Sequence, residues 1–138
     1  MATTYMSNDY QLSLRPQVTV TASTTLDETG FGKDYNVGTD ALVITLPAIT
    51  TKNIGAEFLF RNIGAAGNNI ITLSPNASDK IVGTISAAAA DVTLTGTANK
   101  DLINTKATSK KGDFVKLRAV AANTWYIEQA IGVWAQEA

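Results

Sequence analysis

The stretch Glu57–Val82, EFLFRNIGAAGNNIITLSPNASDKIV, decides the fold of this chain. Two extended runs, Phe58–Asn62 and Ile70–Leu73, flank a connector, Ile63–Asn69, that is rich in glycine and asparagine. Both residue types tolerate positive φ, so the connector can reverse the chain at little steric cost. In the first run the two phenylalanines share one face, and the second run is apolar and mostly β-branched, which suits a buried strand. The pattern predicts an antiparallel hairpin at the centre of an all-β domain.

Short alternating runs separated by turn residues continue on both sides of this stretch. Ala41–Leu46 predicts a strand that ends at Pro47, and Phe114–Val120 with Thr124–Gln129 predict a second hairpin. The helix-favouring run Ala87–Ala90 is long enough for a single turn at most. We count eight to ten short strands, a pattern typical of a jelly-roll-like antiparallel β-sandwich. The residues expected in its core are Phe58, Phe60, Ile71, Leu73, Leu117 and Trp125.

The composition indicates one domain with few charges. The chain has 138 residues, enough for a single domain with a sizeable core, and charged residues make up 17% where about 25% is usual. The net charge of −1 gives no bulk attraction to nucleic acid or to an anionic membrane, and no apolar run reaches the length of a membrane span. The first residues lack the basic and apolar regions of a signal peptide, so we expect synthesis in a cytoplasm.

The residue types of most active sites are missing or scattered. Histidine is absent, which removes the commonest general base and the commonest transition-metal ligand, and cysteine is absent too. No G-x-S-x-G nucleophile motif and no calcium-loop spacing occur, and the acidic residues lie singly among loop signals, except for Asp27-Glu28. We therefore expect no enzymatic activity, no catalytic residue, and no metal or other cofactor.

Residues 1–15 form a polar segment ahead of the predicted sandwich domain, residues 16–138. The segment contains Tyr5, Met6 and Tyr10 but shows no sustained period. It can be read as a frayed terminus, or as an extended arm that orders against a partner with its tyrosines as amphipathic anchors. We expect the arm, because the segment is too polar to join the core and too aromatic for an idle tail.

Lysines gather just before the second predicted hairpin, with only Asp113 opposing them. They are Lys106, Lys110, Lys111 and Lys116. Two interpretations are open: a solvated loop whose charges protect an apolar strand from aggregation, or a patch that docks on an acidic protein surface. On the second interpretation Lys110 and Lys111 contact the partner, and Trp134 near the C-terminus is a further contact. Nucleic acid fits less well, since no aromatic residues interleave with these lysines.

Three segments together resemble the decoration, or cementing, proteins of tailed-bacteriophage heads, which bind the outside of the capsid shell. They are ITLPA (Ile44–Ala48), the stretch quoted above extended to Gly83, and GDFVKLRAVAANTWYIEQAIGVWA (Gly112–Ala135). The resemblance implies a jelly-roll-like sandwich, homodimers or homotrimers at a capsid symmetry axis, and contacts with the major capsid protein. It implies no catalytic residues and no fixed contact motif, so the contact residues named above are our own predictions.

The expected function is therefore that of a virion protein on the outer capsid surface, made in the host bacterial cytoplasm, with no nucleic-acid or membrane partner. A rival hypothesis is a receptor- or glycan-binding β-domain of a phage tail fibre or spike, because similar modules also suit other virion parts. A sugar site favours exposed aromatic rings beside carboxylates. The candidate pairs are Tyr35 with Asp34, and Trp125-Tyr126 with Glu128.

Overall fold

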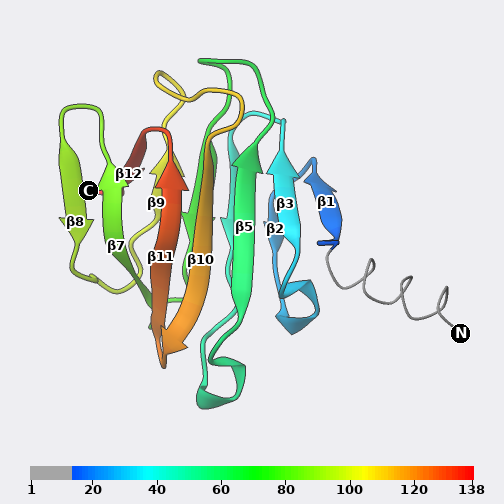
Figure 1. The fold of residues 1–138 in the computed structure, drawn as a ribbon, viewed down its shortest axis with the longest axis vertical. Helices are drawn as coiled ribbons and strands as arrows, with labels where there is room; N and C mark the ends of the chain where they lie inside the picture. Colours follow the sequence, from blue (N-terminus) through cyan, green and yellow to red (C-terminus); the bar gives the residue numbers. More distant parts are fainter. Residues whose placement is uncertain (1–13) are drawn as a thin grey trace, which may run out of the picture.

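The computed structural model describes residues 14–138, which form an all-β molecule (Figure 1). Strands hold 46% of the described residues and helices 5%, which confirms the all-β prediction. In chain order the elements are β1 (Gln17–Val20), β2 (Thr24–Thr25), the 3-10 helix η1 (Glu28–Gly30), β3 (Asp34–Val37), β4 (Leu42–Thr45), the 3-10 helix η2 (Thr51–Asn53), β5 (Glu57–Asn62), β6 (Ile71–Ser74), β7 (Lys80–Ser86), β8 (Asp91–Leu94), β9 (Leu102–Asn104), β10 (Phe114–Ala121), β11 (Thr124–Ile131) and β12 (Trp134–Gln136). The predicted contacts Tyr5, Met6 and Tyr10 lie outside the described residues.

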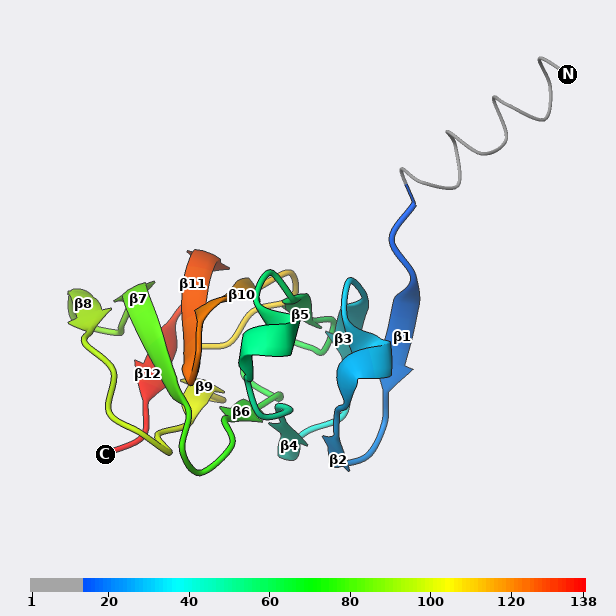
Figure 2. The same cartoon turned by 90° about the horizontal axis from the view of Figure 1, so that it is seen from below.

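The strands form two stacked sheets, which Figure 2 shows as two layers. One sheet has seven strands in the order β1-β3-β5-β10-β11-β7-β8, and the other has five in the order β12-β9-β6-β4-β2. This arrangement confirms the predicted β-sandwich. Pairing within the sheets is mixed, because β1-β3-β5 and β2-β4-β6 are parallel neighbours whereas β5-β10-β11 and β6-β9-β12 are antiparallel.

The first six strands alternate between the two sheets, so this half of the chain winds as a coil. The antiparallel hairpin predicted from Phe58 to Leu73 is therefore wrong: β5 lies in the seven-stranded sheet and β6 in the five-stranded one. The connector crosses from one layer to the other, and Asn62, the residue directly before it, bonds both to the connector and to the other layer. The side chain of Asn62, in β5, donates to Asn104 Oδ1 of β9 at 2.8 Å and accepts from the Gly64 amide at 2.8 Å.

The second predicted hairpin is confirmed, since β10 and β11 pair antiparallel with two register shifts. The core is also as predicted, because all six expected residues have no exposed surface. Its centre is aromatic: the Phe58 ring lies 5.7 Å from Tyr35, 5.6 Å from Phe60 and 5.5 Å from Trp125 between centroids. The segment Ala87–Ala90 is a turn between β7 and β8, closed by a 3.1 Å bond from the Ala87 amide to the Ala90 carbonyl, and holds no helical turn.

A buried carboxylate, Asp79, bonds to two parts of the chain that are far apart in the sequence. Asp79 has no exposed surface, and its Oδ2 accepts from the Ile49 amide at 2.9 Å. Its Oδ1 accepts from Asn123 Nδ2, also at 2.9 Å. One side chain thus joins three parts of the molecule: the residue directly after the ITLPA segment, the start of β7 and the β10–β11 turn.

Candidate partner-binding surfaces

The outer side of the five-stranded sheet carries no charge. None of its five strands contains Asp, Glu, Lys or Arg. Its outward residues include Val43, Thr72, Ile103 and Ala135, which the register places side by side in one row across four strands. We call this surface, formed by Val43, Thr45, Thr72, Ser74, Ile103 and Ala135, the uncharged face. Small uncharged side chains on a sheet lose little on desolvation, so the uncharged face suits contact with another protein.

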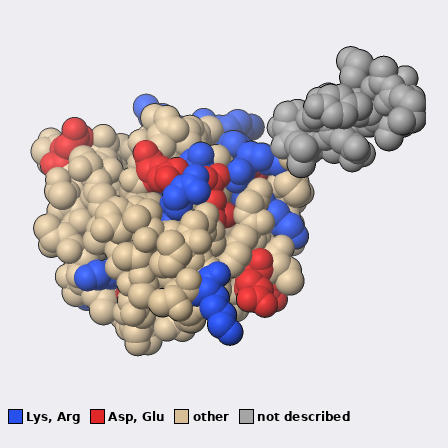
Figure 3. Space-filling model, turned by 60° about the horizontal axis from the view of Figure 1, so that its bottom comes forward, with Lys and Arg blue, Asp and Glu red and all other residues tan. Residues whose placement is uncertain are grey.

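The outer side of the seven-stranded sheet is different, because ion pairs link β3, β5, β10 and β11 to one another and to Arg15, which precedes β1. Figure 3 shows acidic and basic side chains gathered next to one another on one side of the molecule. Glu57 is paired with Arg15 at 2.9 Å, with Lys116 at 3.5 Å and with Arg118. Asp34 is paired with Arg15 at 2.6 Å. With their charges matched within the sheet, these residues leave little net field for an outside partner.

Asp34 is the most enclosed carboxylate of that face. Burial by itself would raise the pKa of Asp34, but hydrogen bonds from Gln17 and Arg15, with the charges of Arg15 and Arg61, outweigh it and hold the pKa below its ordinary value. Gln17 Nε2 donates to Asp34 Oδ2 at 3.0 Å. Asp34 therefore remains ionised at neutral pH and acts as an acceptor that fixes the start of β1 against β3.

The four lysines that are close in the sequence differ in the structure: two of them form ion pairs with acidic residues of the same chain, and two are exposed in a loop. Lys106 pairs with Asp40, and Lys116 pairs with Glu57, so two of the four lysines serve the molecule's own acids. Lys110 and Lys111 are exposed, and their loop is anchored by a 2.9 Å bond from the Lys110 amide to Asp113 Oδ2. Both remain candidate contacts, although two lysines make a much smaller patch than four.

Trp134, which the sequence analysis predicted as a partner contact, is buried instead. Trp134 has no exposed surface, and its Nε1 donates to the Ile131 carbonyl at 3.1 Å. The reason is the alternation of β12, which turns Trp134 into the core and Ala135 outward. Trp134 therefore closes the interior and cannot meet a partner.

The aromatic rings considered for a sugar site are mostly buried as well. Tyr35 is 4% exposed, and its hydroxyl donates to the Gly30 carbonyl at 3.2 Å, while Trp125 is fully buried. Of the rings considered for a sugar site, only Tyr126, at 41% exposed, faces outward, opposite Arg118 and two residues before Glu128. One ring and one carboxylate are therefore left of the predicted sugar-binding pairs.

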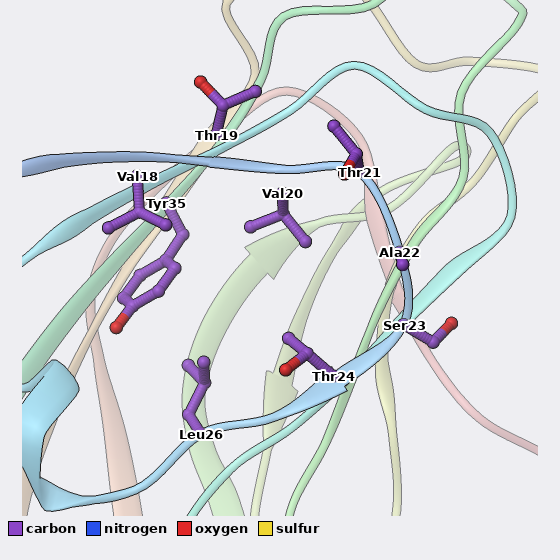
Figure 4. A pocket seen from close by; sticks show the side chains of 9 residues that line it. All are labelled: Val18, Thr19, Val20, Thr21, Ala22, Ser23, Thr24, Leu26 and Tyr35. Atoms are coloured by element: carbon purple, nitrogen blue, oxygen red, sulfur yellow. The ribbon is translucent and has the colours of Figure 1, made fainter.

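Sequence reasoning missed the open end of the sandwich. There β1 and β2 are the edge strands of the two sheets, and a groove of about 310 Å³ lies between them (Figure 4). Val18, Val20, Leu26 and Tyr35 form its apolar lining, with threonine, serine and alanine from Thr19–Thr24 at its rim. We call this groove and the two edges the open end. The available signal was the run Pro16–Leu26, eleven residues without a charge.

Within residues 14–138 no three His, Cys, Asp or Glu side chains gather closely enough to hold a metal ion. In the same range no helix is long and apolar enough to cross a membrane. Compared with models of known protein families the chain gives no match, and compared with curated proteins it gives none either.

Proposed function

We propose that this chain is a structural virion protein that binds the outer surface of a tailed-phage capsid and cements its major capsid protein subunits. The observation that carries the proposal is the uncharged face, an outward surface of β-branched and small residues on a sheet whose strands contain no charged residue. The resemblance of the three quoted segments to decoration proteins supplies the partner. Such a protein acts by binding the assembled shell in preference to its separated subunits, which stabilises the shell by mass action.

The size of the uncharged face indicates how such binding has to work. Four strands at about 4.8 Å spacing and three to four residues at about 3.3 Å give an area on the order of 200 Å². A stable protein–protein contact usually buries about 800 Å² on each partner. One copy therefore needs further contacts, for which residues 1–15, Lys110 and Lys111 are the proposed sources, or several linked copies that bind together.

Co-sedimentation with purified mature capsids tests the proposal. Thr72 lies in the middle of the uncharged face, so a Thr72→Lys variant puts an unpaired charge where the capsid contact is proposed. We expect this variant to lose at least tenfold in affinity, which corresponds to about 1.4 kcal/mol. The matched control is Thr93→Lys on β8, an exposed threonine of the other sheet, which should bind as the unchanged chain does.

The second candidate function, receptor or glycan binding in a tail fibre or spike, is favoured only by exposed Tyr126 beside Glu128. It predicts retention on host cells or on immobilised glycans, abolished by Tyr126→Ala and unaffected by Thr72→Lys. Co-sedimentation of the unchanged chain with cells but not with capsids would replace the cementing proposal with this one.

A further inference from the structure

We infer that the open end receives an extended strand from the N-terminal segment, residues 2–12, of a second copy of this chain, so that two copies exchange strands reciprocally. This inference concerns self-association in the free protein, and it holds whether or not the chain binds a capsid.

At the open end, and within the described part of the chain, β1 has backbone hydrogen-bonding groups that are free to pair with a further strand. The Asp34 amide donates to the Pro16 carbonyl at 2.9 Å, so residues 16, 18 and 20 direct their backbone groups toward β3. By the same alternation Gln17 and Thr19 present theirs to the side on which the described chain has no strand. An exposed edge of this kind is a template for strand addition.

The apolar interior is also open at this end. Figure 4 shows the side chains of Val18, Val20, Leu26 and Tyr35 directed into the space between β1 and β2. At the opposite end of the sandwich a bridge between Ser86 and Val133 joins the two layers. The open end therefore lacks a cover that the other end has, and a strand laid along β1 would supply it.

The residues that precede β1 in the sequence are numerous enough, and have the right alternation of apolar side chains, to form a strand beside β1. Thirteen residues precede Leu14, whereas β1 needs a partner of only about four residues. In an extended strand alternate residues share a face, so Met6, Tyr10 and Leu12 would all point toward the groove. The groove lining carries no charge, which matches these three side chains.

The course of the chain favours a second copy over the same copy. Arg15 is held on the outer side of the seven-stranded sheet by Asp34 at 2.6 Å and Glu57 at 2.9 Å. Figure 2 shows the residues just before β1 leaving on the side away from β2, and Leu14 is 54% exposed. Residues 14–16 thus lead away from the groove of their own copy, and a reciprocal exchange would give each copy the cover that it lacks.

The absence of cysteine makes a direct test possible. Thr19→Cys marks the open edge of β1, and Ser7→Cys marks the donated segment. We mix the two single variants, add a short bismaleimide, and expect a crosslinked dimer of one Thr19→Cys chain and one Ser7→Cys chain. The matched control mixes Ser7→Cys with Thr93→Cys, on the opposite edge strand of the same sheet, and should give no such dimer.

Two further measurements complete the test. Sedimentation equilibrium should find the full chain dimeric, and a chain lacking residues 2–11 monomeric, with circular dichroism confirming that the truncated chain is folded. A full chain that is monomeric, or a truncated chain that keeps the full chain's state, overturns the inference. So does a Ser7→Cys/Thr19→Cys double variant that crosslinks only within one chain, because the segment would then cover its own groove.

Discussion

Replacing Asp79 with alanine tests how much one buried carboxylate, bonded to two distant parts of the chain, contributes to the stability of the fold. Asp79 accepts two hydrogen bonds of 2.9 Å, from the Ile49 amide and from Asn123 Nδ2. These two partners lie 30 and 44 residues away in the sequence. No other acceptor for the Ile49 amide is recorded among the described residues, so alanine leaves this donor without its bond.

The two bonds differ in what their loss costs. Ile49 is 3% exposed, so its amide would remain buried and unpaired, which costs about 1–3 kcal/mol. Asn123 is exposed, and its amide can turn to water at little cost. We therefore expect Asp79→Ala to lower the free energy of unfolding by about 1–3 kcal/mol.

Urea denaturation followed by tryptophan fluorescence measures this change, because Trp125 and Trp134 are both buried in the native state. Asp79→Asn keeps an oxygen for the Ile49 amide, and Asn123 can rotate its amide to complete the second bond, so this variant should lose less than about 1.5 kcal/mol. The control is Asp91→Ala at the exposed start of β8, expected within about 0.5 kcal/mol of the unchanged chain. An Asp79→Ala variant that falls within the same 0.5 kcal/mol would refute the reasoning.

Three other predictions concern the core, the ion-paired residue Asp34 and a turn. Phe60→Ala should lower the free energy of unfolding, measured by urea denaturation, by about 3–5 kcal/mol because Phe60 is fully buried. Val120→Ala, at a half-exposed site, should change this free energy little, and equal effects of the two variants would contradict the assignment of Phe60 to the core. The pKa of Asp34 is lowered in the folded state, so its contribution is complete above the unfolded pKa of about 3.9 and is lost as pH falls through the folded pKa. In the Asp34→Asn variant the free energy of unfolding should therefore fall less steeply below about pH 5 than in the unchanged chain. If the two chains lose stability equally as the pH falls, ionised Asp34 does not stabilise the fold. Gly132→Ala should lower the thermal midpoint strongly, because Gly132 has a φ of 97° and an added Cβ would lie 2.2 Å from Asp113 Cγ. Gly112 has a similar φ of 98° but open space around it, so Gly112→Ala introduces the backbone strain without the clash and should lower the midpoint less.

The sequence predicted the facing of residues better than the pairing of strands. Alternation of apolar and polar side chains determines which residues are buried, and it identified Phe58, Phe60 and Trp125 correctly. It does not determine which strand lies beside which. The connector Ile63–Asn69 has the turn composition of a hairpin, yet it crosses between sheets because Asn62 bonds to Asn104, forty-two residues further on. Such a long-range side-chain bond leaves no local pattern in the sequence.

The candidate surfaces were harder to predict for the same reason. The uncharged face is assembled from four short strands that are scattered between residues 42 and 136, and it becomes a surface only once those strands are adjacent. Trp134 was misjudged because a tryptophan near a terminus resembles an interface residue by type, whereas the strand alternation of β12 turns it inward. Lys110 and Lys111 were correctly placed in an exposed loop, since lysines beside glycine are rarely buried.

The residues that carry the resemblance to capsid decoration proteins act mainly inside the molecule. Ile44 and Leu46 fill the core, Asn62 bridges the sheets, and Asp79 joins three segments. These inward residues stabilise the interior, and they do so whatever the surface of the molecule binds. The two proposed functions therefore share the motif and differ only in outward residues. A lysine at Thr72 leaves the motif intact and changes the uncharged face alone, so its effect on capsid binding separates the two functions where substitutions in the motif could not.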